Sequence, residues 1–307
     1  MQKKQLQSSG ILLLTSLIWG IAFVAQSVAM DYIKPFTFNG IRCILGGVVL
    51  LPVIALMKRF STSKKESLTP KEGSKELGFF HSIEFKGGVC FGLALFVASN
   101  LQQFGVMYST PGKAGFLTAL YILLVPIMGL FIGKKVIGRI WFCVAMALVG
   151  VFLLCVTEQL TIEMGDILLI LCAFFFSVHI LVIDYFSPKA NGTIMSCIQF
   201  FVCGALSLIC MGLFERPILS DILMASKPIA YAGVMSCGVA YTLQIIGQKD
   251  TNPTVASLIL SMESVFAYLG SFVILGQKLS RREALGSLLV FVAIILAQLP
   301  TRKRSNI

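Results

Sequence analysis

Three ionisable residues stand inside long apolar runs of this sequence, where a charge needs a physical reason. They are Arg42, His179 and Glu263. At the centre of a bilayer a charged side chain costs roughly 3 kcal/mol. A residue of this kind is therefore expected to pair within the protein or to take part in its chemistry, and these three are the first functional candidates.

Glu263 lies near the middle of the apolar run 254–275. It shares one helical face with Ala256, Leu260 and Ala267. Removal from water penalises the charged form of a carboxyl group, so Glu263 is predicted to exchange a proton or to pair with a cationic group of a bound solute. The alternative is a carboxyl group that only holds helices together by hydrogen bonds.

His179 and Arg42 each allow two interpretations. His179, in the run 165–184, is predicted to relay protons, and the alternative is an interhelical hydrogen bond. Arg42 lies in the outer part of the run 36–57, within snorkelling distance of water. A packing or orienting role is favoured for Arg42, with attraction of anionic groups as the alternative.

Amide and aromatic side chains recur at helical spacing in the two halves of the chain. Asn100, Gln103 and Met107 follow i, i+3, i+7, and the run 229–248 repeats this spacing with Tyr241, Gln244 and Gln248. Such a set suits a cavity that offers hydrogen bonds and aromatic faces, although interhelical hydrogen bonding is the alternative. The predicted substrate-binding residues are Trp19, Asn100, Gln103, Tyr121, Tyr241, Gln244 and Glu263, and the predicted proton-coupling residues are Glu263 and His179.

The elements that position these residues follow from composition. The chain has 307 residues, of which 57% are hydrophobic and 13% charged, whereas a soluble domain carries about 25% charged residues. Lipid must therefore be the solvent for most of the chain. The apolar runs predict an all-α membrane protein of ten transmembrane helices near 10–30, 36–57, 86–108, 112–132, 139–156, 165–184, 193–213, 229–248, 254–275 and 283–299. A kink is expected at Pro126, beside Tyr121.

The net charge of +11 is explained by membrane orientation rather than by nucleic-acid binding. If the N-terminus is cytoplasmic, 17 basic residues lie in cytoplasmic segments and seven in outer ones. This bias predicts that both termini and the loop 58–85 are cytoplasmic. The nine cysteines fall inside apolar runs without a CxxC pair, so they are interpreted as packing residues, and neither a metal nor another cofactor is predicted.

The sequence contains an internal repeat. A shift of 157 residues aligns Trp19 with Phe176 and Gly47 with Gly204, and a shift of 143 aligns the segment after Gly133 with that after Gly276. The chain is thus predicted to form two five-helix halves, 1–157 and 158–307. Because five is odd, the second half enters the membrane inverted and the two halves enclose a central cavity, an arrangement typical of secondary transporters.

Several motifs resemble those of the EamA-type transporters of the drug/metabolite transporter superfamily. They are Trp19–Phe23, Arg42–Gly46, Gly115–Tyr121 with Pro126, and Ala256–Phe266. The resemblance covers essentially the whole chain. It implies a ten-helix carrier in which helices 1–4 and 6–9 surround the cavity, with helices 5 and 10 at its periphery. Where the family often has Gly-Glu, this chain has Gly133-Lys134 and Gly276-Gln277, which argues against a role for a glutamate there.

Two small-residue motifs predict close contacts between helices. One is Gly88-x-x-x-Gly92 and the other is Gly129-x-x-x-Gly133. Both are interpreted as structural.

The function predicted from these features is secondary active transport of a small metabolite, an amino acid or a similar polar or amphipathic solute. Export across the cytoplasmic membrane by alternating access, with proton coupling, is favoured. The alternatives are an importer and a lipid flippase or scramblase. An enzyme is disfavoured because the sequence has two histidines, no HExxH and no GxSxG. The expected partners are the solute and the lipid bilayer, and the oligomeric state stays open, a homodimer included.

Overall fold

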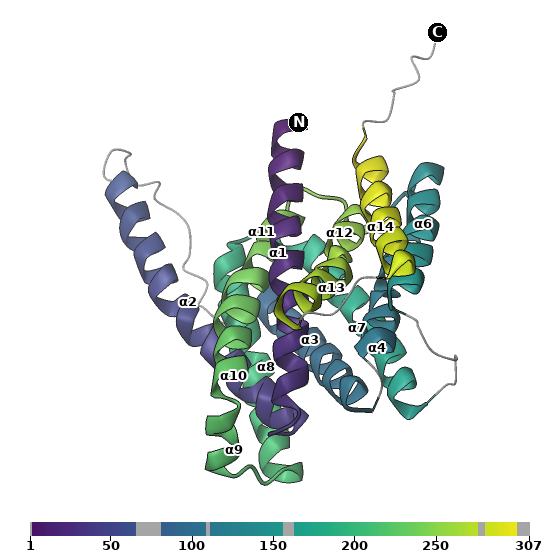
Figure 1. Ribbon diagram of the computed structural model, residues 1–307. Helices are drawn as coiled ribbons and strands as arrows, with labels where there is room; N and C mark the ends of the chain where they lie inside the picture. The colour runs from purple at the N-terminus through teal and green to yellow at the C-terminus, as the bar shows by residue number, and fades with distance from the viewer. Residues whose placement is uncertain (1, 66–80, 109–110, 156–162, 276–279, 300–307) are drawn as a thin grey trace.

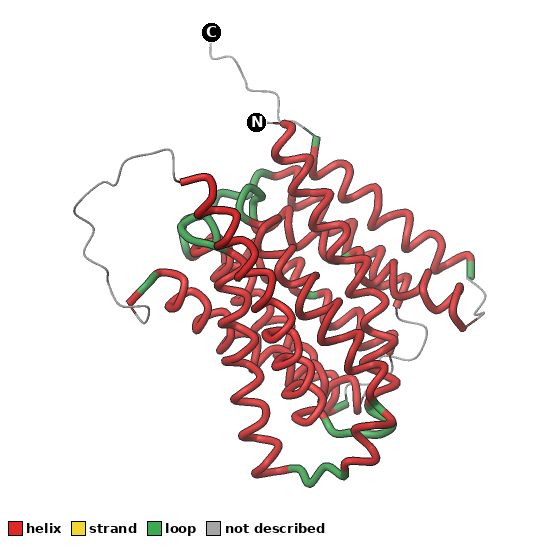
Figure 2. Tube along the Cα trace, turned by 90° about the vertical axis from the view of Figure 1, so that its left-hand side faces the viewer, coloured by secondary structure: helices red, strands yellow, loops and turns green. Residues whose placement is uncertain are grey.

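The computed structural model describes residues 2–65, 81–108, 111–155, 163–275 and 280–299, which form helices joined by short connections (Figures 1 and 2). The boundary predicted between the halves at 157/158, most of the loop 58–85 and the segment Gly276–Lys278 lie outside the described residues. Within the described residues there is no strand.

The helices follow the apolar runs. They are α1 (Gln2–Ala29), α2 (Pro35–Lys65), α3 (Ile83–Tyr108), α4 (Pro111–Ala119), α5 (Tyr121–Phe131), α6 (Gly138–Cys155), α7 (Met164–Phe186), α8 (Gly192–Phe214), α9 (Leu219–Met224), α10 (Ser226–Tyr231), the π-helix η2 (Ala232–Tyr241), α11 (Thr242–Gln248), α12 (Pro253–Leu260), α13 (Met262–Leu275) and α14 (Arg281–Gln298).

Seven helices in the described residues are long and apolar enough to cross a membrane. Two shorter apolar helices, Gly138–Leu153 and Pro253–Ala267, accompany them. The helix α2 continues to Lys65, eight residues beyond its predicted end, and its last turns lean away from the other helices (Figure 1). Many large apolar side chains, such as Leu14 and Phe142, are exposed, as expected for surfaces that face lipid.

The helices pack in pairs drawn from the two halves of the sequence. The helix α2 packs along α8, and α6 packs along α14 beside the main group of helices (Figure 1). The helix α3 contacts both α7 and α8, while α1 contacts α13 and the continuous helix α10–η2–α11. Contacts between the halves therefore build the centre of the molecule.

Two helical segments are interrupted at corresponding places. The segment 111–131 breaks at Leu120, and the segment 253–275 breaks at Ser261. At the first break the Leu120 amide donates to the Leu117 carbonyl at 3.3 Å, a tighter turn than an α-helix has. Pro126, where a kink was predicted, lies inside α5, and the break in the segment comes six residues earlier, at Leu120.

Of the two small-residue motifs, one makes the predicted contact. A Cβ atom at Gly88 would lie 2.5 Å from Cβ of Ile198 in α8, so α3 and α8 approach closely there, and Gly92 contacts α8 in the same way. For the second motif the prediction is wrong. Gly133 has a φ of +79° and belongs to the turn after α5, where glycine avoids the penalty of a left-handed conformation.

Candidate functional site

A central cavity lies between helices of both halves of the sequence. About 40 Å³ of it can hold the centres of water molecules, which is room for a few waters. Any larger solute requires the helices to move apart. Its lining residues are Trp19, Phe23, Gln26, Arg42, Gln102, Thr118, Tyr121, Phe176, Ile180, Ser236, Tyr241, Gln244, Leu260 and Glu263.

Five of the seven predicted binding residues line this cavity. They are Trp19, Tyr121, Tyr241, Gln244 and Glu263. They come from α1, α5, η2, α11 and α13, so residues far apart in the sequence meet at one place. The π-helix brings Ser236 as well as Tyr241 to the lining, and wide helical turns of this kind are frequent at functional sites.

Glu263 and Tyr121 form the polar centre of the cavity. The Tyr121 hydroxyl group donates a hydrogen bond to Oε1 of Glu263 at 3.0 Å, and the Glu263 side chain is 7% exposed. Both residues lie just beyond a helix break. Tyr121 is the first residue after Leu120, and Glu263 is the second residue after Ser261. The breaks therefore place the carboxyl and hydroxyl groups where the two interrupted segments meet.

Aromatic rings form another part of the wall. The ring centroids of Trp19 and Tyr241 are 4.6 Å apart at an interplanar angle of 59°. Tyr241 also forms T-shaped ring contacts with Phe200 and His179. An aromatic wall beside a carboxyl group can hold an apolar or cationic part of a solute.

Three predicted residues lie outside the lining. Asn100 hydrogen-bonds Ser207 of α8 at 3.2 Å and accepts from Asn39 of α2 at 3.0 Å, and Gln103 donates to the Gln26 carbonyl at 3.4 Å. His179 is fully buried, and its Nε2 lies 2.8 Å from Oε1 of Gln199. These contacts join helices, which is the alternative considered for each of them.

Several polar atoms on the wall have no hydrogen-bond partner among the described residues. The unsatisfied atoms include Nε1 of Trp19, Oε1 of Gln26, Nε of Arg42 and Oε1 of Gln244. Buried polar groups are normally hydrogen-bonded, and leaving one unpaired costs about 1–3 kcal/mol. The cavity therefore has unused donors and acceptors for water or a polar solute.

The lining residues recur at two constant sequence separations. Trp19 and Phe176, like Phe23 and Ile180, are 157 residues apart. Three further pairs are 142 apart: Gln102 with Gln244, Thr118 with Leu260, and Tyr121 with Glu263. Residues at these two separations in the sequence thus face the same cavity.

Sequence reasoning missed part of this lining, although a signal for some of it was present. Phe176 is the repeat partner of Trp19 in the sequence alignment, and Gln102 adjoins the predicted Gln103. Arg42 was considered but assigned to packing or orientation. In the structure it is 3% exposed and lines the cavity.

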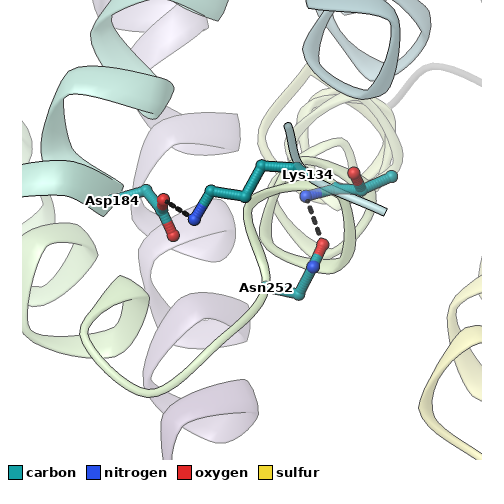
Figure 3. Close-up of polar contacts among 4 residues, drawn as sticks. Lys134, Asp184 and Asn252 are labelled. Atoms are coloured by element: carbon teal, nitrogen blue, oxygen red, sulfur yellow. Dashed lines mark hydrogen bonds and ion pairs between the residues drawn. The ribbon is translucent and has the colours of Figure 1, made fainter. Parts of the chain in front are cut away.

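One ion pair joins the halves away from the cavity. Nζ of Lys134, in the turn after α5, lies 2.5 Å from Oδ2 of Asp184 in α7 (Figure 3). The Lys134 side chain is 41% exposed and that of Asp184 13%. Among the described residues no cluster of three histidine, cysteine or acidic side chains is placed to hold a metal ion.

Comparisons with known proteins agree with this architecture. The sequence profile of the EamA-like transporter family matches residues 8–156 and 163–299. An uncharacterized transporter of Archaeoglobus fulgidus is 30% identical over 301 residues, which cover 96% of this chain and 87% of the relative. The crystal structure of a protein with 18% identity has a similar fold, with a TM-score of 0.71 over 95% of this chain and 96% of the other.

Proposed function

Since this chain belongs to the EamA-like transporter family, we propose that it is a secondary carrier that moves a small polar or amphipathic solute through its central cavity. The chain is a multi-pass membrane protein with several long apolar helices. The observation that carries the proposal is the cavity between the halves, walled by aromatic rings and by polar atoms without partners.

Ten membrane-spanning segments in two inverted halves fit this carrier. The two shorter apolar helices and the last helix α14, added to the seven long ones, complete ten segments. The paired lining residues at separations of 157 and 142 support the repeat. The packing supports it too, because α2 with α8 and α6 with α14 are contacts between corresponding helices. Two related halves of this kind can alternate between inward-open and outward-open shapes.

Proton coupling at Glu263 follows from its position. The carboxyl group is buried at the meeting point of two broken helices, and its one described hydrogen-bond partner is the Tyr121 hydroxyl group. No basic residue within the described part of the chain forms an ion pair with it. A carboxyl group in this setting can take a proton or a cationic group of the solute in turn.

We propose export across the cytoplasmic membrane as the direction. Profiling metabolites in the medium and the cytoplasm of cells that express this chain, against cells with an empty vector, tests it. Solutes enriched in the medium support an exporter, whereas solutes enriched inside the cells would make it an importer. Equal profiles for every soluble compound would contradict the proposal for soluble metabolites.

A lipid flippase or scramblase is the second candidate, and one surface feature favours it. An apolar groove runs between α2, α3 and α8, lined by side chains that include Leu51, Phe85, Ile198 and Phe201. A groove of this composition suits an acyl chain. Movement of a fluorescent phospholipid between leaflets of proteoliposomes, compared with protein-free vesicles, distinguishes this activity.

A further inference from the structure

Arg42 lines the cavity and forms no ion pair with any described residue. Its side chain is 3% exposed, and its Nε has no hydrogen-bond acceptor. Among the described residues no carboxylate lies within ion-pair distance of it. A buried arginine is normally paired, because an uncompensated charge removed from water is strongly unfavourable.

The surroundings of Arg42 do not replace a counter-ion. Its guanidinium carbon lies 4.9 Å above the ring centroid of Phe38, one turn earlier in α2. The titratable groups nearest to it are the thiols of Cys43, Cys203 and Cys237 and the hydroxyl group of Tyr241. The cation–π contact and the neighbouring thiol and hydroxyl groups stabilise the charge in part, but none of them supplies the carboxylate that a guanidinium fork matches.

Arg42 and Glu263 also break the repeat of the cavity wall. The residue that corresponds to Arg42 at a separation of 157 is Gln199, and Glu263 corresponds to Tyr121 at a separation of 142. The neutral lining pairs are shared between the halves, whereas each charge occurs once. Arg42 and Glu263 both line the cavity without forming an ion pair with each other, and Tyr121 donates a hydrogen bond to Glu263, so the cavity has a basic part and a separate acidic part.

We propose that Arg42 binds a carboxylate group of the transported solute, so that the carrier selects solutes with a single negative charge at one end. This inference rests on the proposed transport function and adds the substrate class. A carboxylate fits better than a phosphate, because no other lysine, arginine or histidine lines the cavity. A second negative charge would stay uncompensated in a medium of low dielectric constant. With Glu263 available for a cationic group, an amphoteric solute with an apolar side chain matches both charges and the aromatic wall.

The test compares metabolite export by the full-length chain and three variants at equal membrane levels. They are Arg42→Gln, which removes the charge, Arg42→Lys, which keeps the charge without the fork, and Arg216→Gln, a control that removes an exposed positive charge outside the cavity lining. We expect the intact chain and Arg216→Gln to export solutes that carry a carboxylate. Arg42→Gln is expected to reduce this export by at least about tenfold, and Arg42→Lys to restore part of it.

If the solutes that the intact chain exports carry no anionic group, the inference is overturned and the transport function stands. Carboxylate export by Arg42→Gln at the rate of the intact chain would have the same consequence. If the intact chain changes the level of no soluble metabolite on either side of the membrane, the proposed function itself fails and the inference fails with it.

A second measurement keeps the inference testable if Arg42→Gln does not fold. The melting temperature of the purified intact protein is measured with each exported solute and with the carboxamide of that solute. The carboxylate form is expected to raise the melting temperature and the carboxamide to leave it unchanged. Equal stabilisation by both forms would contradict carboxylate binding by Arg42.

Discussion

The cavity lining contains one basic residue, Arg42, and one acidic residue, Glu263. Each charge can therefore be tested separately. Glu263 is buried with one described hydrogen bond, from Tyr121. Arg42 is buried too, and its Nε has no hydrogen-bond partner among the described residues. Among the described residues neither side chain forms an ion pair with a charged partner, and we propose that solutes and protons that enter the cavity are those partners.

Glu263→Gln is predicted to lower transport and to flatten its pH dependence. A glutamine keeps the shape of the side chain and can accept a hydrogen bond from Tyr121, but it cannot take up a proton. Glutamine also loses the charge of the hydrogen bond to a cationic group of the solute; such a bond is worth about 1.5–3 kcal/mol, which corresponds to roughly ten- to hundredfold in transport rate. The measurement is export as a function of medium pH.

The control is Asp250→Asn, at an exposed acidic residue. A Glu263→Gln protein that keeps the original rate and pH profile would exclude proton coupling at Glu263.

At the scale of helices, close approach of α1 and α13 fixes the position of Glu263. A Cβ atom at Gly20 would lie 2.6 Å from Cβ of Phe266 and 2.8 Å from the backbone oxygen of Glu263. Both are shorter than real Cβ contacts, and a backbone atom cannot give way as a flexible side chain does. The glycine therefore allows the helix with Glu263 to reach the cavity.

Gly20→Ala is predicted to destabilise the protein by about 1–3 kcal/mol, because overpacking forces two helices apart. Gly10→Ala in the same helix is the matched control, since a Cβ atom there meets nothing within 4 Å. Thermal unfolding in detergent is the measurement. If the two variants unfold at the same temperature, the close contact of α1 and α13 is not present.

The ion pair of Lys134 and Asp184 joins the turn after α5 to α7. Since Lys134 is 41% exposed, the pair is expected to contribute below about 1 kcal/mol to stability. Its effect should be larger on the exchange between conformations, because it joins helices from different halves. Lys134→Glu is predicted to change the transport rate and to leave the melting temperature nearly unchanged.

The double variant Lys134→Glu with Asp184→Lys restores an ion pair and should recover transport. Lys135→Glu, at the exposed neighbouring lysine, controls for the change in net charge. Equal transport by Lys134→Glu, Lys135→Glu and the intact chain would show that the pair has no part in the transport cycle.

At the scale of the whole molecule, the positions of basic residues predict which end faces the cytoplasm. Lys135 belongs to a cytoplasmic connection in this orientation, and Ser220, in α9, to an outer one. Both are exposed. Ser220→Cys is predicted to react with a membrane-impermeant maleimide in intact cells, and Lys135→Cys only after the cells are permeabilised.

The intact chain is the control for this labelling, because its cysteines lie in apolar segments. Reaction of Lys135→Cys in intact cells, without reaction of Ser220→Cys, would reverse the orientation. Such a result would also reverse the predicted side of both termini.

The sequence by itself determined that the chain forms apolar helices in lipid, and it identified about half of the polar residues of the cavity. Apolar runs long enough to span lipid leave the chain no other regular structure, because every backbone amide in lipid must be paired within its own segment. The residue-type argument about buried ionisable groups identified Glu263, and helical spacing identified Tyr241 and Gln244, all of which line the cavity.

Only the tertiary structure decided which polar residues face the cavity and which join helices. Asn100 and Gln244 both carry a carboxamide side chain and follow the same helical spacing. Nevertheless, Asn100 joins α3 to α2 and α8, while Gln244 lines the cavity. Likewise, Arg42 is oriented inward although its position in the sequence allowed it to reach outer water. Helical spacing defines a face of one helix, but the neighbour of that face is set by packing between distant segments, and this information does not lie in any single segment.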